Sequence, residues 1–132
     1  METLYKWLRT VVTAQKGRLM WGSEDTIDEW ALAGKRLDQD WIVFVTESEH
    51  SIEDINDNRM VYRLALAGCW SNASDPDVAQ RIGEHVADVA GALETGAIPA
   101  TCTRIEIVGP AAWATRGGVT VVALTVEAQL QR

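Results

Sequence analysis

The pattern that most constrains the fold is the strict alternation in residues 116–132, RGGVTVVALTVEAQLQR. Apolar side chains occupy every second position of its later part: Val122, Leu124, Val126, Ala128 and Leu130. Polar side chains occupy the positions between and after them: Thr125, Glu127, Gln129 and Gln131. A period of two places the apolar set on one face, which is typical of a half-buried β-strand. We predict a strand over 119–131 that is held by a neighbour in this chain or in another copy, because unsupported chain ends fray.

A helix is predicted to begin beside Asp75. Asp75 is a favourable N-cap, Pro76 suits the first helical position, and Gly96 is expected to end the helix. Apolar residues recur at helical spacing between them: Val78, Ile82, Val86, Val89 and Leu93. We expect this stripe to pack on a sheet. Gly83 and Gly91 lie in a strip of small residues beside it, and because glycine costs helix stability, they predict a close backbone approach there.

The other periodic segments predict a second helix and three further strands. Helical spacing over residues 2–15 gives one apolar stripe, formed by Leu4, Trp7, Leu8, Val11 and Val12. Apolar and β-branched runs over 41–46, 59–70 and 103–108 predict strands. The resulting order is helix, strand, strand, helix, strand, strand. It indicates an α+β fold, with a mainly antiparallel sheet covered by two helices.

Two segments between these elements are predicted to be loops. Residues 16–40 show no regular period and are expected to form a long loop, a kind of segment that is often functional. Residues 47–59 carry a cluster of carboxylates between two strands, so we expect an exposed acidic hairpin tip. The length of 132 residues, 47% of them apolar, suits a single domain over residues 1–132.

Cysteine use and hydropathy set the expected compartment. Cys69 and Cys102 show no C-x-x-C spacing, so we favour two buried thiols in a reducing compartment over a redox pair or thiolate ligands. No apolar run approaches about 18 residues, and no charged-then-apolar leader opens the sequence. We therefore expect neither a membrane span nor a signal peptide.

The charge and the aromatic content favour protein contacts over nucleic-acid binding. The net charge is −7, and the 12 basic residues are scattered rather than clustered, which disfavours tight binding to nucleic acid. Six tryptophans are many for this length: Trp7, Trp21, Trp30, Trp41, Trp70 and Trp113. Because tryptophan is enriched at protein–protein contacts, we expect part of this set at interfaces and the rest in the core.

No group of residues in the sequence predicts catalysis. Glu49, His50, Glu53 and Asp54 could gather a metal ion, but their spacing matches no calcium loop, and we expect a solvated tip without metal. His85 is expected to be an ordinary surface histidine. The serines lack a nucleophile-elbow context. We predict a protein that is not an enzyme and that has no catalytic residue, no cofactor and no metal.

Three runs of the sequence resemble the tail terminator proteins of tailed bacteriophages. These runs are WIVFVTES…RMVYRLALAGCW, DPDVAQRIGEHVADVAGAL and TRIEIVGPAAW…RGGVTVVALTVEAQLQ. In that family of small α+β proteins, a helix that begins D-x-x-A follows a strand with an Arg–aromatic pair. Here Asp75 with Ala79, and Arg63 with Tyr62, stand at those positions. The resemblance covers roughly two-thirds of the chain, as a pattern rather than an invariant motif, and leaves residues 16–40 unmatched.

The resemblance implies a ring, commonly a hexamer, at the head-proximal end of the tail tube. Such a ring would end tube growth and join the tail to the head. Its partners would be further copies of itself, the tail tube protein and a head-completion or connector protein. DNA would pass through the lumen without specific binding, for which an acidic wall is suited. We thus expect a structural protein of the virion neck, made in the host cytoplasm and without membrane contact.

Ten residues are predicted to contact other subunits or partners: Trp21, Trp30, Glu49, Glu53, Asp54, Trp113, Arg116, Thr125, Glu127 and Gln129. The strand over 119–131 is central to this prediction, because a long free edge would otherwise promote aggregation. We expect either its backbone edge or its polar face at a subunit contact. Two alternatives stay open. The protein could be another connector or stopper of the same neck, or a small α+β enzyme or ligand-binding domain with a pocket of converging polar groups.

Overall fold

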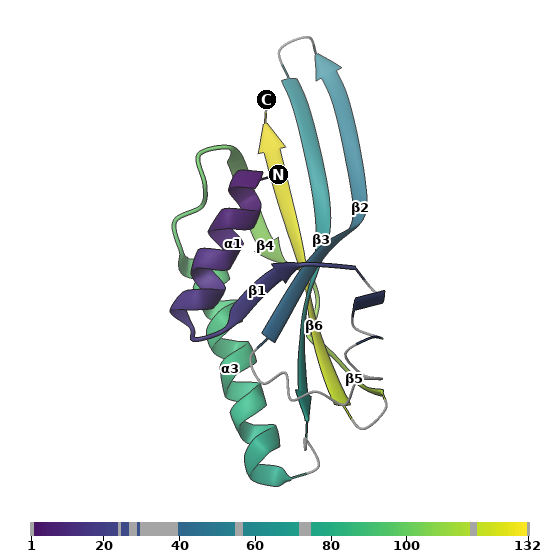
Figure 1. The fold of residues 1–132 in the computed structure, drawn as a ribbon. Helices are drawn as coiled ribbons and strands as arrows, with labels where there is room; N and C mark the ends of the chain where they lie inside the picture. Colours follow the sequence, from purple (N-terminus) through teal and green to yellow (C-terminus); the bar gives the residue numbers. More distant parts are fainter. Residues whose placement is uncertain are drawn as a thin grey trace.

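The computed structural model describes residues 2–23, 25, 26, 29, 40–54, 57–71, 75–116 and 119–131, apart from the side chains of 2, 50–54, 57–59, 71, 116, 119 and 131. The helices are α1 (Glu2–Ala14) and α3 (Pro76–Thr95). The strands are β1 (Arg18–Trp21), β2 (Asp40–Asp54), β3 (Asp57–Ser71), β4 (Cys102–Ile107), β5 (Ala112–Arg116) and β6 (Val119–Gln131). Both helices lie on the same side of the sheet (Figure 1). The predicted α+β fold is confirmed.

The six strands that the described residues form belong to one mixed sheet. Its order is β1-β2-β3-β6-β4, and β5 pairs with β6 as well. The β1–β2 pair is parallel and the other pairs are antiparallel. Along β6, β5 pairs with residues 119–123 and β4 with residues 126–130, so these two strands share one edge of the sheet and β1 forms the opposite edge. The predicted order lacked β1 and β5, and the predicted antiparallel character holds for all pairs but one.

The two faces of the sheet carry different side chains. Cross-strand partners share a face. The helix face, under α1 and α3, holds the main core, with Trp41, Leu64 and Val126 fully buried. The helix-free face carries a smaller cluster that includes Ile42 and Cys69. Both cysteines are buried free thiols, as expected, and burial raises the pKa of Cys102 above its usual value.

The long strand β6 is an interior strand, not an edge. Its predicted core face is confirmed, since Val122, Leu124, Val126 and Ala128 are buried and Leu130 packs against them. β3 pairs with it from residue 119 to residue 131, and β4 and β5 cover its other side. Between those two strands, the Val108 amide donates to the Thr125 carbonyl at 2.9 Å. The prediction that the backbone edge of β6 is free for a subunit contact is therefore wrong. Alternation shows which face of a strand is buried, but it does not show how many neighbours the strand has.

Helix α3 begins and packs as its sequence predicts. The Asp77 amide donates to the Asp75 Oδ1 atom at 2.9 Å, and Pro76 opens the helix. The apolar stripe is buried through Ile82, Val86, Val89 and Leu93, and Val78 packs partly against the same core. The predicted close approach at the small residues is wrong for the described part of the chain. A methyl group added at Gly83 or Gly91 would meet no atom within 4 Å.

Helix α1 covers the other part of the helix face. Leu4, Leu8 and Val12 are buried, which confirms the predicted stripe. The Trp7 indole Nε1 donates to the Ala97 carbonyl at 2.7 Å and so ties α1 to the segment after α3. No helix among the described residues is long and apolar enough to cross a membrane.

Strands occupy parts of three segments that were predicted to be loops or connections. β1 lies within the segment 16–40, whose residues 30–39 fall outside the described part of the chain. β2 and β3 extend through most of the predicted acidic tip and form a long hairpin that projects past the end of β6 (Figure 1). β5 replaces part of a predicted connection. Short edge strands and projecting hairpins bury little, so their sequences need no hydrophobic alternation.

Candidate assembly surfaces

Among the described residues, the largest exposed aromatic side chains lie at opposite edges of the sheet. Trp21 on β1 and Trp113 on β5 are each 49% exposed. β1 forms one edge, and β4 and β5, which both pair with β6, form the other. Trp21 pairs in register with Val43 and Trp113 with Val122, both of the main core, so both tryptophans are on the helix face. Both side chains are exposed on the subunit, and their role in a contact stays a prediction.

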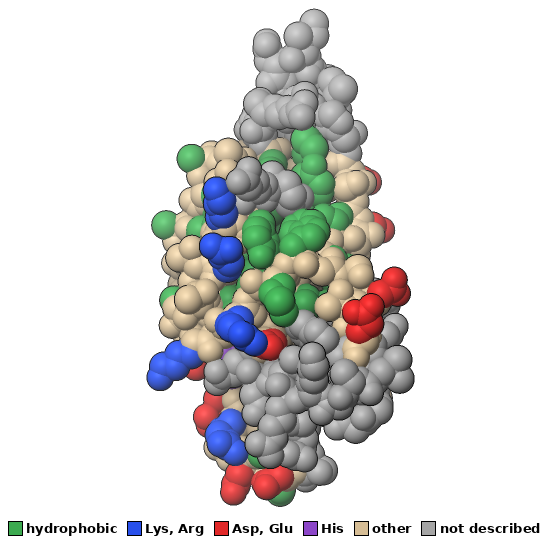
Figure 2. Space-filling model, in the orientation of Figure 1, with side chains coloured by type: hydrophobic (Ala, Val, Ile, Leu, Met, Phe, Trp, Pro, Cys, Tyr) green, Lys and Arg blue, Asp and Glu red, His purple; other side chains and the backbone are tan. Residues whose placement is uncertain are grey.

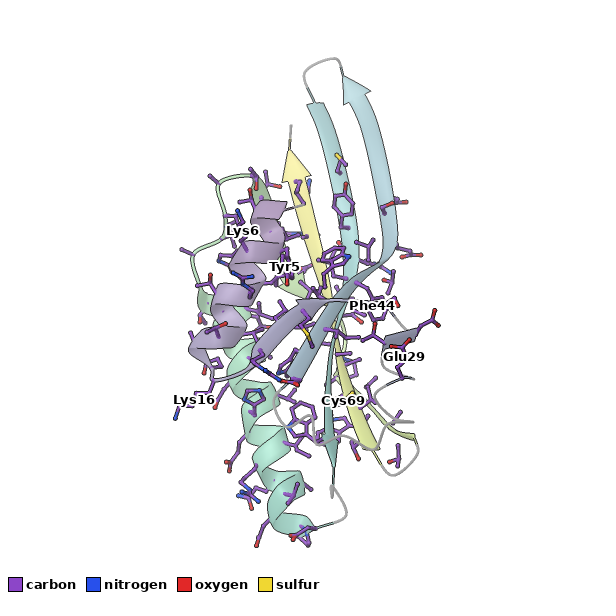
Figure 3. The ribbon with its side chains drawn as sticks, viewed as in Figure 1. Tyr5, Lys6, Lys16, Glu29, Phe44 and Cys69 are labelled. Atoms are coloured by element: carbon purple, nitrogen blue, oxygen red, sulfur yellow. The ribbon has the colours of Figure 1, made fainter. Side chains whose placement is uncertain are left out.

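The β1 edge carries exposed apolar side chains, and its one charged residue, Arg18, is paired with Asp40. The rings of Tyr5 and Trp21 meet edge to face with centroids 5.7 Å apart, and Tyr5 lies between α1 and the sheet (Figure 3). Met20 is 42% exposed on the helix-free face of the same strand. Arg18 forms two hydrogen bonds of 2.8 Å with the buried Asp40 carboxylate, which raise the pKa of the guanidinium further. Hydrophobic side chains gather at the centre of the face in Figure 2.

The β5 edge carries no charge on its described side chains. Ala112, Trp113, Ala114 and Thr115 are all exposed. Edge strands of soluble proteins are commonly protected by lysine, proline or inward-pointing charges. The described side chains of β5 offer none of these, so within the described part of the chain this edge lacks the usual protection. Arg116, a predicted contact residue, ends the strand, and its side chain lies outside the description.

A row of alternating charges crosses the helix-free face. Arg63 on β3 bridges Glu47 on β2 at 3.3 Å and Glu127 on β6 at 3.2 Å. Arg104 on β4 then bridges Glu127 at 3.3 Å and Glu106 at 3.2 Å. The Glu127 side chain is only 16% exposed, and its two oxygens face two arginines of its own chain. Glu127 thus has its partners within the subunit.

Sequence reasoning identified only part of this charged face. Thr125, Glu127 and Gln129 alternate along β6, and Glu49 shares their face through its pairing with Val61, which pairs with Gln129. Glu49 also lines a pocket of about 450 Å³ with Glu47, Ser48, Val61, Arg63 and Glu127. Arg63, Arg104 and Glu106 were not predicted in this role. Their strand register was the missing information, because they are neighbours across strands rather than along the sequence.

The remaining predicted contact residues are only partly described. Trp30 lies outside the described residues. Glu53 and Asp54 are the last residues of β2, where Asp54 pairs with Asp57 at the end of the β2–β3 hairpin, and their side chains lie outside the described part of the chain. Among the described side chains, no group of three His, Cys, Asp or Glu could hold a metal ion.

His85 is not the ordinary surface histidine that its sequence neighbours predict. The Trp41 indole Nε1 donates to its Nε2 atom at 3.0 Å, and the rings of Trp41 and Trp70 lie 5.8 and 6.0 Å from its own. Burial lowers the pKa of His85, and the nearby Asp88 opposes that shift. His85 therefore fixes α3 to the sheet. Its position on the helix, three residues after Ile82 and one before Val86, was the available signal.

Comparisons with known proteins find matches among solved structures. No family model and no curated protein matches this sequence. Solved structures that match include a chain from the virion of a native gene transfer agent particle. That chain is 11% identical, the match covers 69% of each chain, and the TM-score is 0.49.

Proposed function

We propose that this protein is a structural, non-enzymatic component of a phage-like virion, and that it forms the tail terminator ring. Copies of the chain would assemble at the head-proximal end of the tail tube, end its growth and present a surface to the head or connector. The single observation that carries assembly is the pair of half-exposed tryptophans at opposite edges of one sheet. The identity of the ring rests on the sequence resemblance to terminators.

The exposed tryptophans favour a role in assembly on energetic grounds. A tryptophan buries about 150–250 Å² when it is enclosed, so leaving two of them half exposed forgoes stabilisation that a contact would recover. Tryptophan is also one of the residue types enriched among the few residues that contribute most of the binding energy of an interface. A partner that covers both edges is the simplest explanation of their position.

The acidic character of the chain supports a lumen through which DNA passes. The net charge is −7. On the helix-free face, Glu47, Glu49 and Glu106 are exposed, while the arginines there are paired with carboxylates. Such a surface repels the phosphate backbone of DNA rather than binding it. We propose that this face, rather than either tryptophan edge, borders the DNA path.

Assembly on tail tubes tests the proposed function. Purified protein would be added to tubes formed by the tube protein of the same particle, and tube lengths and ends would be measured by negative-stain electron microscopy. We expect rings at one end of each tube and growth that stops there. Rings that bind only the connector would favour the alternative of a neck stopper. Binding to neither would contradict a role in the neck.

A further inference from the structure

We propose that copies of this chain join head to tail through their sheet edges, with β1 of one copy beside β5 of the next. This inference rests on the proposed ring and specifies its subunit contact. Within the described residues, β1 pairs only with β2 and β5 only with β6. Each strand therefore has one side without a strand partner among the described residues, and the two lie at opposite edges of the sheet.

The side chains of the two edges match in size when the sheet continues from copy to copy. Trp21 and Trp113 both project on the helix face, so they would come together on that face of a continuous sheet. On the helix-free face, β1 carries the long Met20 side chain, and β5 carries the small Ala112 and Ala114. Aromatic pairs across strands and large-against-small packing are both favourable arrangements between strands.

Electrostatics identifies the occupant of each edge as another copy of the chain. Two molecules that each carry a charge of −7 repel except where carboxylates are absent or neutralised. The described side chains of β1 and β5 include no carboxylate, and Asp40 beside β1 is paired with Arg18. Glu47 and Glu49, in contrast, are exposed on β2. The two edges are therefore the places where a like-charged copy can approach closely.

A head-to-tail contact explains both tryptophans, whereas a two-fold contact explains only one. If β1 met a second β1, Trp21 would be buried and Trp113 would stay exposed. A contact between different edges leaves one free edge at each end of a pair, so it repeats until a ring closes. Closure then covers the free side of every β1 and every β5 in the assembly.

A complementation experiment tests this pairing. Trp21→Arg blocks the β1 edge, and Trp113→Arg blocks the β5 edge; Ile98→Arg, at a site that is 40% exposed and on neither strand, is the matched control. We expect each edge variant alone to be a monomer by native mass spectrometry. Mixed in equal amounts, they should form a one-to-one dimer, because each supplies the edge that the other lacks. The control should assemble as the wild type does.

The other outcomes separate failure of the pairing from failure of the ring. If the wild type assembles and both edge variants assemble equally well, the pairing is overturned and the ring stands. If Trp113→Arg alone stays a dimer while Trp21→Arg is a monomer, the contact is a two-fold β1 contact. A wild type that is monomeric at its solubility limit overturns the ring as well. Circular dichroism would verify folding, and Met20→Lys with Ala114→Lys would replace any tryptophan variant that fails to fold.

Discussion

At the scale of single residues, Gly68 has the strictest requirement for small size among the described glycines. It faces the helix side of β3, where an added Cβ would lie 2.5 Å from the Trp70 ring and 3.2 Å from Trp41. Both tryptophan rings are buried in the core, in an edge-to-face contact with centroids 5.5 Å apart. Neither ring can move without displacing its neighbours, so Gly68 permits this aromatic contact.

The change Gly68→Ala should destabilise the protein by about 1–3 kcal/mol through overpacking. Its measure is the free energy of unfolding from urea denaturation monitored by tryptophan fluorescence. Gly83→Ala is the control, because that helical position has no neighbour within 4 Å. Alanine there should stabilise by roughly 0.5–1 kcal/mol through helix propensity. A Gly68→Ala variant as stable as the wild type would show that the packing around Trp70 is loose.

His85 should make stability depend on pH. Its pKa is lowered in the folded protein by burial, so the unfolded chain binds a proton that the folded chain does not. The contribution of neutral His85 to the free energy of unfolding is therefore complete above the ordinary pKa of 6.5. It decreases as the pH falls from 6.5 to the lower pKa of the folded state. Thermal melts between pH 8 and pH 5 should show a melting temperature that begins to fall near about pH 6.5, the ordinary pKa of histidine.

Two variants separate the titration of His85 from its hydrogen bond. His85→Gln keeps a carbonyl acceptor for the Trp41 indole and should reduce the pH dependence in this window. His85→Phe removes the acceptor and should cost about 1–3 kcal/mol at pH 8, where the histidine is neutral. An unchanged pH profile in His85→Gln would assign the dependence to other groups.

At the scale of elements, helix α3 was the most predictable part of the fold. Its N-cap, its first residue and its buried stripe are all local sequence features, and each is found in the structure. β6 was equally clear in its period of two. The neighbour of each strand could not be predicted. Asp40 and Cys69, for example, are cross-strand partners although they lie far apart in the sequence. The charged face follows from that register and was missed for the same reason.

The edge strands escaped prediction for a different reason. β1 has only 4 residues and β5 has 5, and each pairs with a single described strand. Such strands bury few side chains, so selection for a core leaves little periodicity in them. The tryptophans Trp21 and Trp113 could be selected as contact candidates from residue type alone, but their opposite positions could not.

Replacing Ile82 tests the packing of α3. Ile82→Asp places a charge at a site that is 2% exposed and should cost at least about 3 kcal/mol. Ala87→Asp, on the exposed side of the same helix, is the control and should cost less than about 1 kcal/mol, mostly through helix propensity. Both would be measured by chemical denaturation, and equal effects of the two changes would contradict the assigned core face.

Glu127 tests the charged row on the helix-free face. Glu127→Gln removes the carboxylate that two arginines share and should cost about 1 kcal/mol at low ionic strength, with a smaller loss at high salt. Glu49→Gln, at an exposed site on the same face, should have almost no effect on stability. If Glu127→Gln also altered the oligomeric mass while Glu49→Gln did not, the polar face of β6 would be part of a subunit contact.

At the scale of the whole molecule, three properties of the chain favour assembly. A core lies under α1 and α3, exposed carboxylates such as Glu47 and Glu49 carry acidic charge at the surface, and β1 and β5 present exposed tryptophans at the sheet edges. A subunit with two different edges and no second copy to cover them would present long-lived aggregation sites. Closed assembly covers the free sides of β1 and β5 at once, which is the physical reason for favouring a ring over a monomer.

The mass of the wild-type assembly in solution tests this claim most directly. Each subunit has a mass of 14.5 kDa. Native mass spectrometry should show one dominant species at a fixed multiple of that mass, with six subunits expected from the resemblance to terminators. Its abundance relative to other oligomers should not change with concentration once the ring has closed. A monomer at every concentration, or an open-ended series of masses that grows with concentration, would contradict the account.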